Sequence, residues 1–142
     1  MADKKQPDRR HIQVDPKAAD RLFHALEIGL ARGVLSVHDQ HVGALLSLGS
    51  ALTFAGRHQE ALEADLRTVE ILKDDPAAWY NLACSYSNLA QVDESLDMLK
   101  KAIDLGYIDF PYLLADPDLE NARRDPRFKE ILNRKWGKRQ PS

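Results

Sequence analysis

An internal repeat constrains the fold of this chain more than any other feature of its sequence. When the sequence is compared with itself so that Leu45 falls on Trp79, apolar residues meet apolar residues and small residues meet small ones. The aligned pairs are Leu45 and Trp79, Leu46 and Tyr80, Leu48 and Leu82, Gly49 and Ala83, Leu52 and Tyr86, Ala61 and Ser95, Leu62 and Leu96, and Val69 and Ile103. A fixed period of about 34 residues is typical of solenoids, in which each repeat buries its apolar face against its neighbours.

Each copy has the apolar spacing of a helical hairpin. The first copy places Leu45, Leu48, Gly49 and Leu52 at positions i, i+3, i+4 and i+7, which form one face of a helix. A turn at residues 56–58 follows, and after it a second amphipathic run begins. The second copy repeats both features. The sequence therefore predicts two antiparallel helices per copy, with small residues where the backbones approach closely.

The second copy also carries a recognisable residue pattern. An aromatic residue, a Leu, a small residue and a Tyr on the first helix precede a small residue, a bulky apolar residue and an Ala on the second. These residues stand in Trp79-Tyr80-Asn81-Leu82-Ala83-Cys84-Ser85-Tyr86, Glu94-Ser95-Leu96, Leu99 and Lys101-Ala102-Ile103. The pattern resembles that of the tetratricopeptide repeat, and the first copy departs from it at Leu45, Asp65 and Thr68. The resemblance implies an all-α fold, a short superhelical solenoid of about two hairpins with capping helices at both ends.

The N-terminal flank is expected to cap the first hairpin. Asp15-Pro16 is a strong helix start, because Asp accepts backbone N–H bonds at the N-cap and Pro fits the first helical position. An apolar stripe follows and is expected to cover the hairpin. It consists of Ala19, Leu22, Phe23, Leu26 and Leu30.

The C-terminal flank has two more helix starts, Asp116-Pro117 and Asp125-Pro126. The last helix is predicted to bury Phe128, Ile131, Leu132 and Trp136. This segment is similar to the closing segment of many bacterial tetratricopeptide proteins, which implies a bacterial source and a complete protein. The expected organisation is a disordered tail at 1–14, a single domain at 15–137 and a tail at 138–142, with the domain divided into an N-terminal helix and connection at 15–41, repeats at 42–75 and 76–109, and capping helices at 110–137.

Composition excludes several classes of protein. A single cysteine excludes a disulfide scaffold, and the sequence has no signal peptide and no apolar run of membrane-spanning length. A soluble cytoplasmic protein is therefore expected. The net charge of −2 conceals a division, because residues 59–120 carry 14 acidic and four basic side chains whereas residues 121–142 carry eight basic and two acidic ones. The basic end is expected to be a solvated cap, with an acidic protein partner or nucleic acid as alternatives.

Candidate chemical groups are few. His38 and His41 flank Asp39, but they lie in a connection without a third ligand, so exposed or capping roles are favoured over a metal or acid–base site. Cys84 has no base nearby in sequence and is predicted to be a packed or groove-lining thiol. Because the chain also lacks recognisable catalytic and nucleotide-binding motifs, we expect no enzyme activity, no cofactor and no metal.

The family resemblance implies a concave surface that binds peptides or partner helices and is lined by the first helix of each repeat. A non-enzymatic protein-interaction module is therefore expected, acting as an adaptor, scaffold or assembly factor. In one alternative, Leu46 and Phe54 meet a second copy in a self-associating scaffold, and in another the N-terminal helix simply covers the concave face. The predicted binding residues are Leu46, Ser50, Phe54, Ala77, Tyr80, Asn81, Cys84 and Asn88, and the same concave surface is expected to include Gly43.

Overall fold

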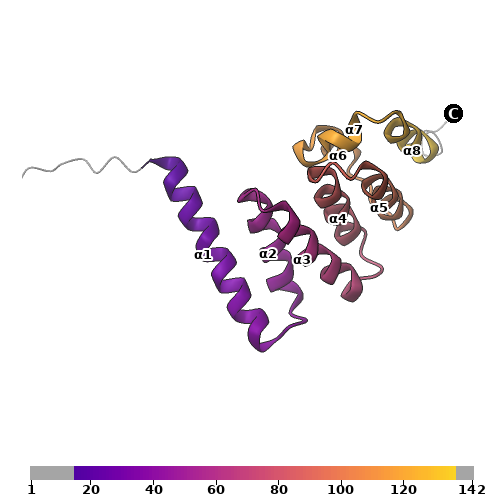
Figure 1. Cartoon of the computed structure of the whole chain (residues 1–142). Coiled ribbons are helices and arrows are strands. Elements are labelled where there is room, and N and C mark those ends of the chain that lie inside the picture. The colour runs from indigo at the N-terminus through magenta and orange to yellow at the C-terminus, as the bar shows by residue number, and fades with distance from the viewer. Residues whose placement is uncertain (1–14, 137–142) are drawn as a thin grey trace, which may run out of the picture.

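A computed structural model describes residues 15–136 of the chain, with side chains to residue 134, and this part is helical and contains no strand. Figure 1 shows the helices following one another along the molecule. The elements are α1 (Pro16–Val37), α2 (Val42–Phe54), α3 (His58–Ile71), α4 (Pro76–Asn88), α5 (Val92–Asp104), α6 (Phe110–Ala115), the 3₁₀ turn η1 (Pro117–Leu119), α7 (Glu120–Arg123) and α8 (Pro126–Trp136). The predicted all-α repeat solenoid is confirmed. The predicted tails, 1–14 and 138–142, lie outside the described residues.

The repeat period extends further along the chain than the sequence comparison indicated. Helices α2, α4 and α6 begin at residues 42, 76 and 110, and helices α3, α5 and α8 begin at 58, 92 and 126, so the spacing between successive starts is constant. From α1 to α5 each helix packs against the next, and α8 packs against α5 and α7. The closing segment, residues 110–136, is therefore built in register with the two repeats, as a third hairpin whose first helix is interrupted after Ala115.

The small residues predicted at the helix crossings are buried. Gly49, Ala61, Ala83 and Ser95 lie on the inside of the two hairpins. The Ser95 hydroxyl donates a hydrogen bond of 2.7 Å to the carbonyl oxygen of Ala83, which joins the two helices of the second repeat directly. A side chain larger than Ala at these positions would separate the helices and lose this packing.

The helix starts follow the Asp-Pro pairs. In each pair the Asp carboxylate accepts a hydrogen bond from the backbone N–H two residues later, at 3.1 Å for Asp15 and 2.9 Å for Asp116 and Asp125. Asp75, before Pro76, does the same at 2.9 Å. These bonds satisfy N–H groups that have no partner inside the helix. The helix starts predicted at Asp15 and Asp125 are confirmed, while Asp116 begins a single 3₁₀ turn that leads into α7.

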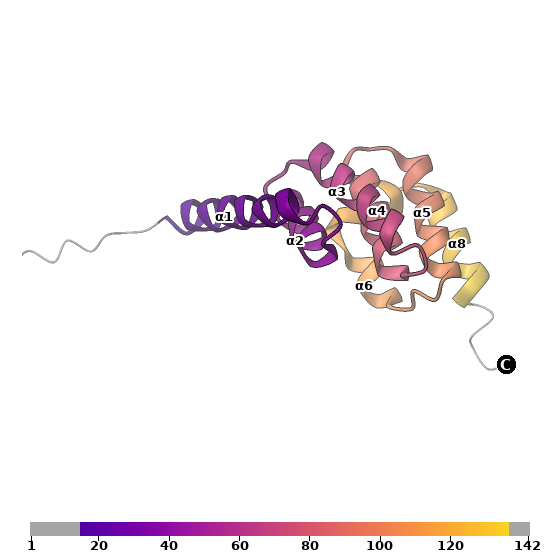
Figure 2. The ribbon, with the colours of Figure 1, turned by 90° about the horizontal axis from the view of Figure 1, so that it is seen from below.

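The prediction of which face α1 buries is wrong. Ile28, Ala31 and Leu35 pack against the first hairpin instead. The predicted stripe is exposed, at 62% for Leu22, 59% for Phe23, 64% for Leu26 and 73% for Leu30, and Ala19 is exposed as well. Apolar residues occupy two sides of α1, and helical periodicity alone does not reveal which side meets α2. In Figure 2, α1 extends away from the other helices, so its N-terminal part has little to pack against.

The last helix packs as predicted where its side chains are described. Phe128 and Leu132 are buried, and Ile131 packs against the same cluster. The side chain of Trp136 lies outside the described residues. No described helix combines the length and the apolar run that a membrane crossing requires.

The turns inside the two repeats share a left-handed residue. Gly56 has φ = 72° and Ala90, at the equivalent position of the second repeat, has φ = 57°. The following residue closes each helix, because its N–H bonds the carbonyl oxygen five residues earlier, at 2.8 Å for Arg57 and 3.0 Å for Gln91. A residue with a Cβ atom is strained in this conformation, whereas glycine is not.

This equivalence predicts opposite effects of two substitutions. Gly56→Ala should lower the free energy of unfolding by about 1 kcal/mol, because it introduces the strain that Ala90 already carries. Ala90→Gly should leave it unchanged or raise it by up to about 1 kcal/mol, since relief of strain exceeds the entropy lost by glycine. Urea denaturation of both variants measures the difference. Equal destabilisation by the two substitutions would contradict it.

Candidate functional site

A groove of about 580 Å³ lies where the first helices of the three hairpins meet. Residues of α2, α4 and the closing segment line it, together with Asp65 of α3 and Tyr107 from the loop before α6, and no described residue of α1 does. The N-terminal helix leaves most of this face open and touches its edge, where the ring of His24 stacks on Phe54 with 5.1 Å between the ring centres. The lining residues are Leu46, Gly49, Ser50, Thr53, Phe54, Asp65, Ala77, Tyr80, Asn81, Cys84, Ser85, Tyr107, Tyr112, Asp116, Pro117 and Asp118.

Seven of the eight predicted binding residues lie in this groove. They are Leu46, Ser50, Phe54, Ala77, Tyr80, Asn81 and Cys84. Asn88 lies outside the lining, and its side-chain amide donates a hydrogen bond of 3.1 Å to Asp118. Gly43 is at the exposed start of α2 and does not line the groove. The sequence therefore placed most of the lining on the two repeats, but it missed the side contributed by the closing segment.

Asp116 connects that closing segment to α4. Its Oδ2 atom accepts a hydrogen bond of 2.6 Å from the Tyr80 hydroxyl, and its Oδ1 atom accepts the backbone N–H of Asp118 at 2.9 Å. The ring of Tyr107 stacks on Tyr80 with 4.3 Å between the ring centres. Burial raises the pKa of Tyr80, and the nearby groups Cys84 and Asp116 add to this effect, so the phenol stays protonated and remains a donor. Tyr80 is therefore a fixed part of the groove floor.

Cys84 lies beside this hydrogen bond and is 7% exposed. Burial raises the pKa of its thiol well above the ordinary value, and the carboxylate of Asp116 raises it further. The sulfur is 3.8 Å from Asp116 Oδ2, a contact suited to a neutral S–H donor. A nucleophilic cysteine needs the opposite environment, one that favours the thiolate. The packed, groove-lining interpretation of Cys84 is confirmed.

Asp65 is a second buried carboxyl group in the groove, and it stands where a tetratricopeptide repeat usually has a bulky apolar residue. It is 6% exposed, and its Oδ2 atom accepts a hydrogen bond of 2.6 Å from the Ser85 hydroxyl. Its Oδ1 atom would lie 2.7 Å from a Cβ atom at Gly49, so glycine is needed there for the carboxyl group to fit. Burial raises the pKa of Asp65 to about 6.

The raised pKa of Asp65 predicts a pH effect on stability. The folded state holds the Asp65 proton more tightly than the unfolded state, so this stabilisation is present at low pH and is lost as the pH rises through about 6. A shift from 3.8 to about 6 corresponds to about 3 kcal/mol. Asp65→Asn cannot ionise. As the pH rises from about 4 to about 7, its free energy of unfolding should therefore rise by about 2 to 3 kcal/mol relative to that of the wild type. Urea denaturation at both pH values measures this gain, and a constant difference between the two proteins would contradict it.

The groove lining is acidic and aromatic. Asp65, Asp116 and Asp118 contribute carboxyl groups, and no Lys or Arg is among the described lining residues. Tyr107 and Tyr112 present aromatic rings beside them, while Leu46 and Phe54 supply apolar surface at the other side. Lys and Arg side chains are attracted both to carboxylates and to aromatic faces. The lining therefore has the chemistry to hold a cationic side chain together with its apolar neighbours.

The histidines in the α1–α2 connection have structural surroundings. The Nδ1 atom of His41 accepts the backbone N–H of Ala44 at 3.0 Å, which confirms a capping role. His38 follows the last residue of α1 and is exposed. Within residues 15–134, no group of three His, Cys, Asp or Glu side chains is arranged to hold a metal ion.

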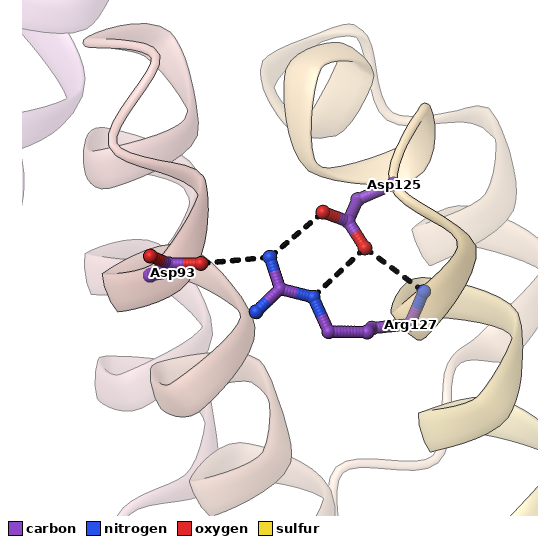
Figure 3. Close-up of polar contacts among 3 residues, drawn as sticks. All are labelled: Asp93, Asp125 and Arg127. Carbon is purple, nitrogen blue, oxygen red and sulfur yellow. Dashed lines mark hydrogen bonds and ion pairs between the residues drawn. The ribbon is translucent and has the colours of Figure 1, made fainter.

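Three arginines of the closing segment, Arg123, Arg124 and Arg127, bind within the protein. Figure 3 shows Arg127 between two carboxylates, with its Nη2 atom 2.7 Å from Asp93 and 2.7 Å from Asp125. The side-chain and backbone hydrogen bonds from Arg127 lower the pKa of Asp125 to about 2. Arg123 donates to the carbonyl oxygens of Leu113 and Asp116, and Arg124 pairs with Glu120. These contacts support the cap interpretation. The side chain of Lys135 and residues Lys138 and Arg139 lie outside the described residues.

Comparisons with known proteins agree with this geometry. The family model of the tetratricopeptide repeat matches residues 76–105, which are α4 and α5 with their turn. A chloroplastic protein from Arabidopsis thaliana is 40% identical to this chain over 83 residues. The aligned region covers 54% of this chain and 24% of that protein, so the chain spans about a quarter of the relative's length.

The relative is a plant protein of the chloroplast, so it lends no support to the bacterial source expected from the closing segment. The bacterial source and the cytoplasmic location stay predictions. The repeat itself has two independent supports, the family match over residues 76–105 and the stacked hairpins that begin at a constant spacing. The chain is a tetratricopeptide-like helical repeat protein.

Proposed function

We propose that this protein is an interaction module whose groove binds an extended segment of a partner protein. The match to the tetratricopeptide repeat supports protein–protein interaction in general, because such repeats are typically non-enzymatic binding folds. The observation that carries the more specific proposal is the open groove of about 580 Å³ at the meeting point of three hairpins. Its mixture of apolar, amide and carboxyl groups suits a peptide backbone with alternating side chains.

The bound segment carries a Lys or Arg side chain. Three carboxyl groups line the groove without a cationic side chain among the described lining residues, so an incoming cation gains attraction in a partly desolvated site. The rings of Tyr107 and Tyr112 add favourable surface for the same cation. The exposed amide of Asn81 is available to the peptide backbone, and Leu46 offers apolar contact to a neighbouring side chain.

A matched pair of serine variants tests this proposal. Ser50 and Ser47 both lie exposed on α2, but only Ser50 lines the groove. Ser50→Arg places a cation where the peptide's cation would bind and should weaken binding at least about tenfold, whereas Ser47→Arg should change the affinity less than about twofold. The probe is a library of extended peptides with a fixed central Lys or Arg, and a library with a central Glu is the reference. Fluorescence anisotropy measures the affinity of each variant for both libraries. Equal affinity of the wild type for the two libraries, or equal affinity of the two serine variants for the Lys or Arg library, would overturn the proposal.

Binding should also depend on pH through Asp65. Because the pKa of Asp65 is raised to about 6, the groove gains a negative charge as the pH rises through this value. The affinity for a basic peptide should therefore increase between about pH 5 and pH 7, and Asp65→Asn should remove most of that increase. The exposed Asp97 on α5 does not line the groove, so Asp97→Asn is the control and should keep the wild-type profile. Identical profiles for Asp65→Asn and the wild type would show that the cation binds elsewhere.

Binding of nucleic acid by the basic closing segment has less support than binding of a peptide by the groove. Arg123, Arg124 and Arg127 already bond carbonyl and carboxylate groups of the protein, and a phosphate would have to compete with these partners. Self-association through Leu46 and Phe54 would use the surface that we assign to the peptide. A different surface is better suited to a second copy, as the apolar side of α1 indicates.

A further inference from the structure

Helix α1 has a second apolar side that no part of the described chain covers. Ile28, Ala31 and Leu35 face the first hairpin. At 3.6 residues per turn, the stripe that contains Leu26 and Leu30 lies on the far side of the helix. The large side chains of this stripe, each 59% to 76% exposed, are Leu22, Phe23, Leu26, Leu30 and Val37.

The N-terminal part of α1 has little support from the rest of the molecule apart from the ring of His24, which stacks on Phe54 of α2 with 5.1 Å between the ring centres. Its buried residues begin at Ile28, and Figure 2 shows the preceding turns extending beyond the other helices. A free helix of about 12 residues is marginal in water, because packing supplies most of the stability of helices in proteins. A partner along the exposed stripe would supply that packing.

We propose that the partner is a second copy of this chain, and that two α1 helices pack against each other in antiparallel orientation. The spacing alternates between three and four residues at Phe23, Leu26, Leu30, Gly33 and Val37, which is the pattern of a two-helix coiled-coil seam. No charged residue stands at these positions. A twofold symmetric interface uses the same surface on both copies, and this stripe can pack against the same stripe of a second copy.

The sizes of the side chains favour the antiparallel arrangement. When Leu26 of one copy lies opposite Leu30 of the other, Phe23 lies opposite Gly33 and Val37 lies opposite Ala19. In the pairs of Phe23 with Gly33 and of Val37 with Ala19, a large side chain therefore meets a small residue. A Cβ atom at Gly33 would have no atom within 4 Å, so there is space above it for the ring of Phe23. A parallel arrangement would instead place the two Phe23 rings together and the two Gly33 residues together.

The exposed apolar side of α1 gives a second copy a continuous surface to cover. Its five large side chains are each 59% to 76% exposed. Removing Val, Leu and Phe side chains from water is favourable, so two copies that cover each other's stripe gain a driving force for association. A shallow groove along the same side of α1 includes Gly29 and Gly33 in its lining and can receive side chains of the partner helix. The antiparallel arrangement also puts the two repeat stacks at opposite ends of the helix pair, so they do not collide.

Sedimentation velocity of the full chain, from about 1 to 200 μM, tests this proposal. The wild type should form a dimer, and Leu26→Glu should weaken dimerisation at least about tenfold, because it places two charges in the seam. Ile108→Glu is the matched control, since Ile108 is 62% exposed and Leu26 is 64% exposed. It should leave the dimer intact. Circular dichroism verifies that both variants keep their helices. A wild type that stays monomeric over this range, or a dimer that Leu26→Glu leaves unchanged, would overturn the proposal.

Disulfide crosslinking tests the orientation. In the antiparallel dimer, Gly29 lies near the twofold axis and a Cβ atom there meets no neighbour within its own chain. Gly29→Cys should therefore crosslink to its symmetry mate on mild oxidation. Val37 lies opposite Ala19, about 27 Å along the helix from the second Val37, so Val37→Cys should not crosslink. The buried thiol of Cys84 does not interfere. Crosslinking through Val37→Cys without crosslinking through Gly29→Cys would overturn the antiparallel arrangement.

Discussion

The hydrogen bond of 2.6 Å from the Tyr80 hydroxyl to the buried carboxylate of Asp116 holds the closing segment against the second repeat. Asp116 stands at the point where the third hairpin leaves the regular pattern, because Pro117 cannot continue the α-helix that ends at Ala115. The interruption turns η1 toward α4 and brings Asp116 and Asp118 to the edge of the groove. This contact therefore helps to set one side of the groove, together with the hydrogen bond from Asn88 to Asp118.

The sequence predicted the elements that depend on local chemistry. The internal repeat indicated the hairpins, and the Asp-Pro pairs indicated the helix starts at Asp15 and Asp125. Most of the groove residues on α2 and α4 followed from the family resemblance, because the first helix of each repeat faces the same way. Their binding role remains a proposal.

Features that depend on contacts far apart in sequence were not predictable in this way. The exposed side of α1 was predicted to be buried, since both of its sides are apolar and only the position of α2 distinguishes them. Asp65 looked like a departure from the repeat pattern, and its role became visible only with Gly49 and Ser85 beside it. The repeat period also continues from the helix start at residue 76 to the helix start at residue 110. The sequence comparison did not detect this third copy, because Pro117 interrupts its hydrophobic pattern.

Two surfaces with different chemistry result from this fold. The groove is acidic and aromatic and suits a basic segment, whereas the far side of α1 is apolar and suits a second copy. A dimer through α1 would present two grooves, and a partner with two basic segments would then bind with a higher effective affinity than a single segment. The central claim is that the concave groove is the binding surface. Nuclear magnetic resonance of the full chain, titrated with a Lys- or Arg-containing peptide from the binding library, tests it most directly. The account predicts that the largest shifts of backbone amide signals fall on Ser50, Asn81 and Tyr112. Shifts confined to α1 or to the outer surfaces of α3 and α5 would contradict it.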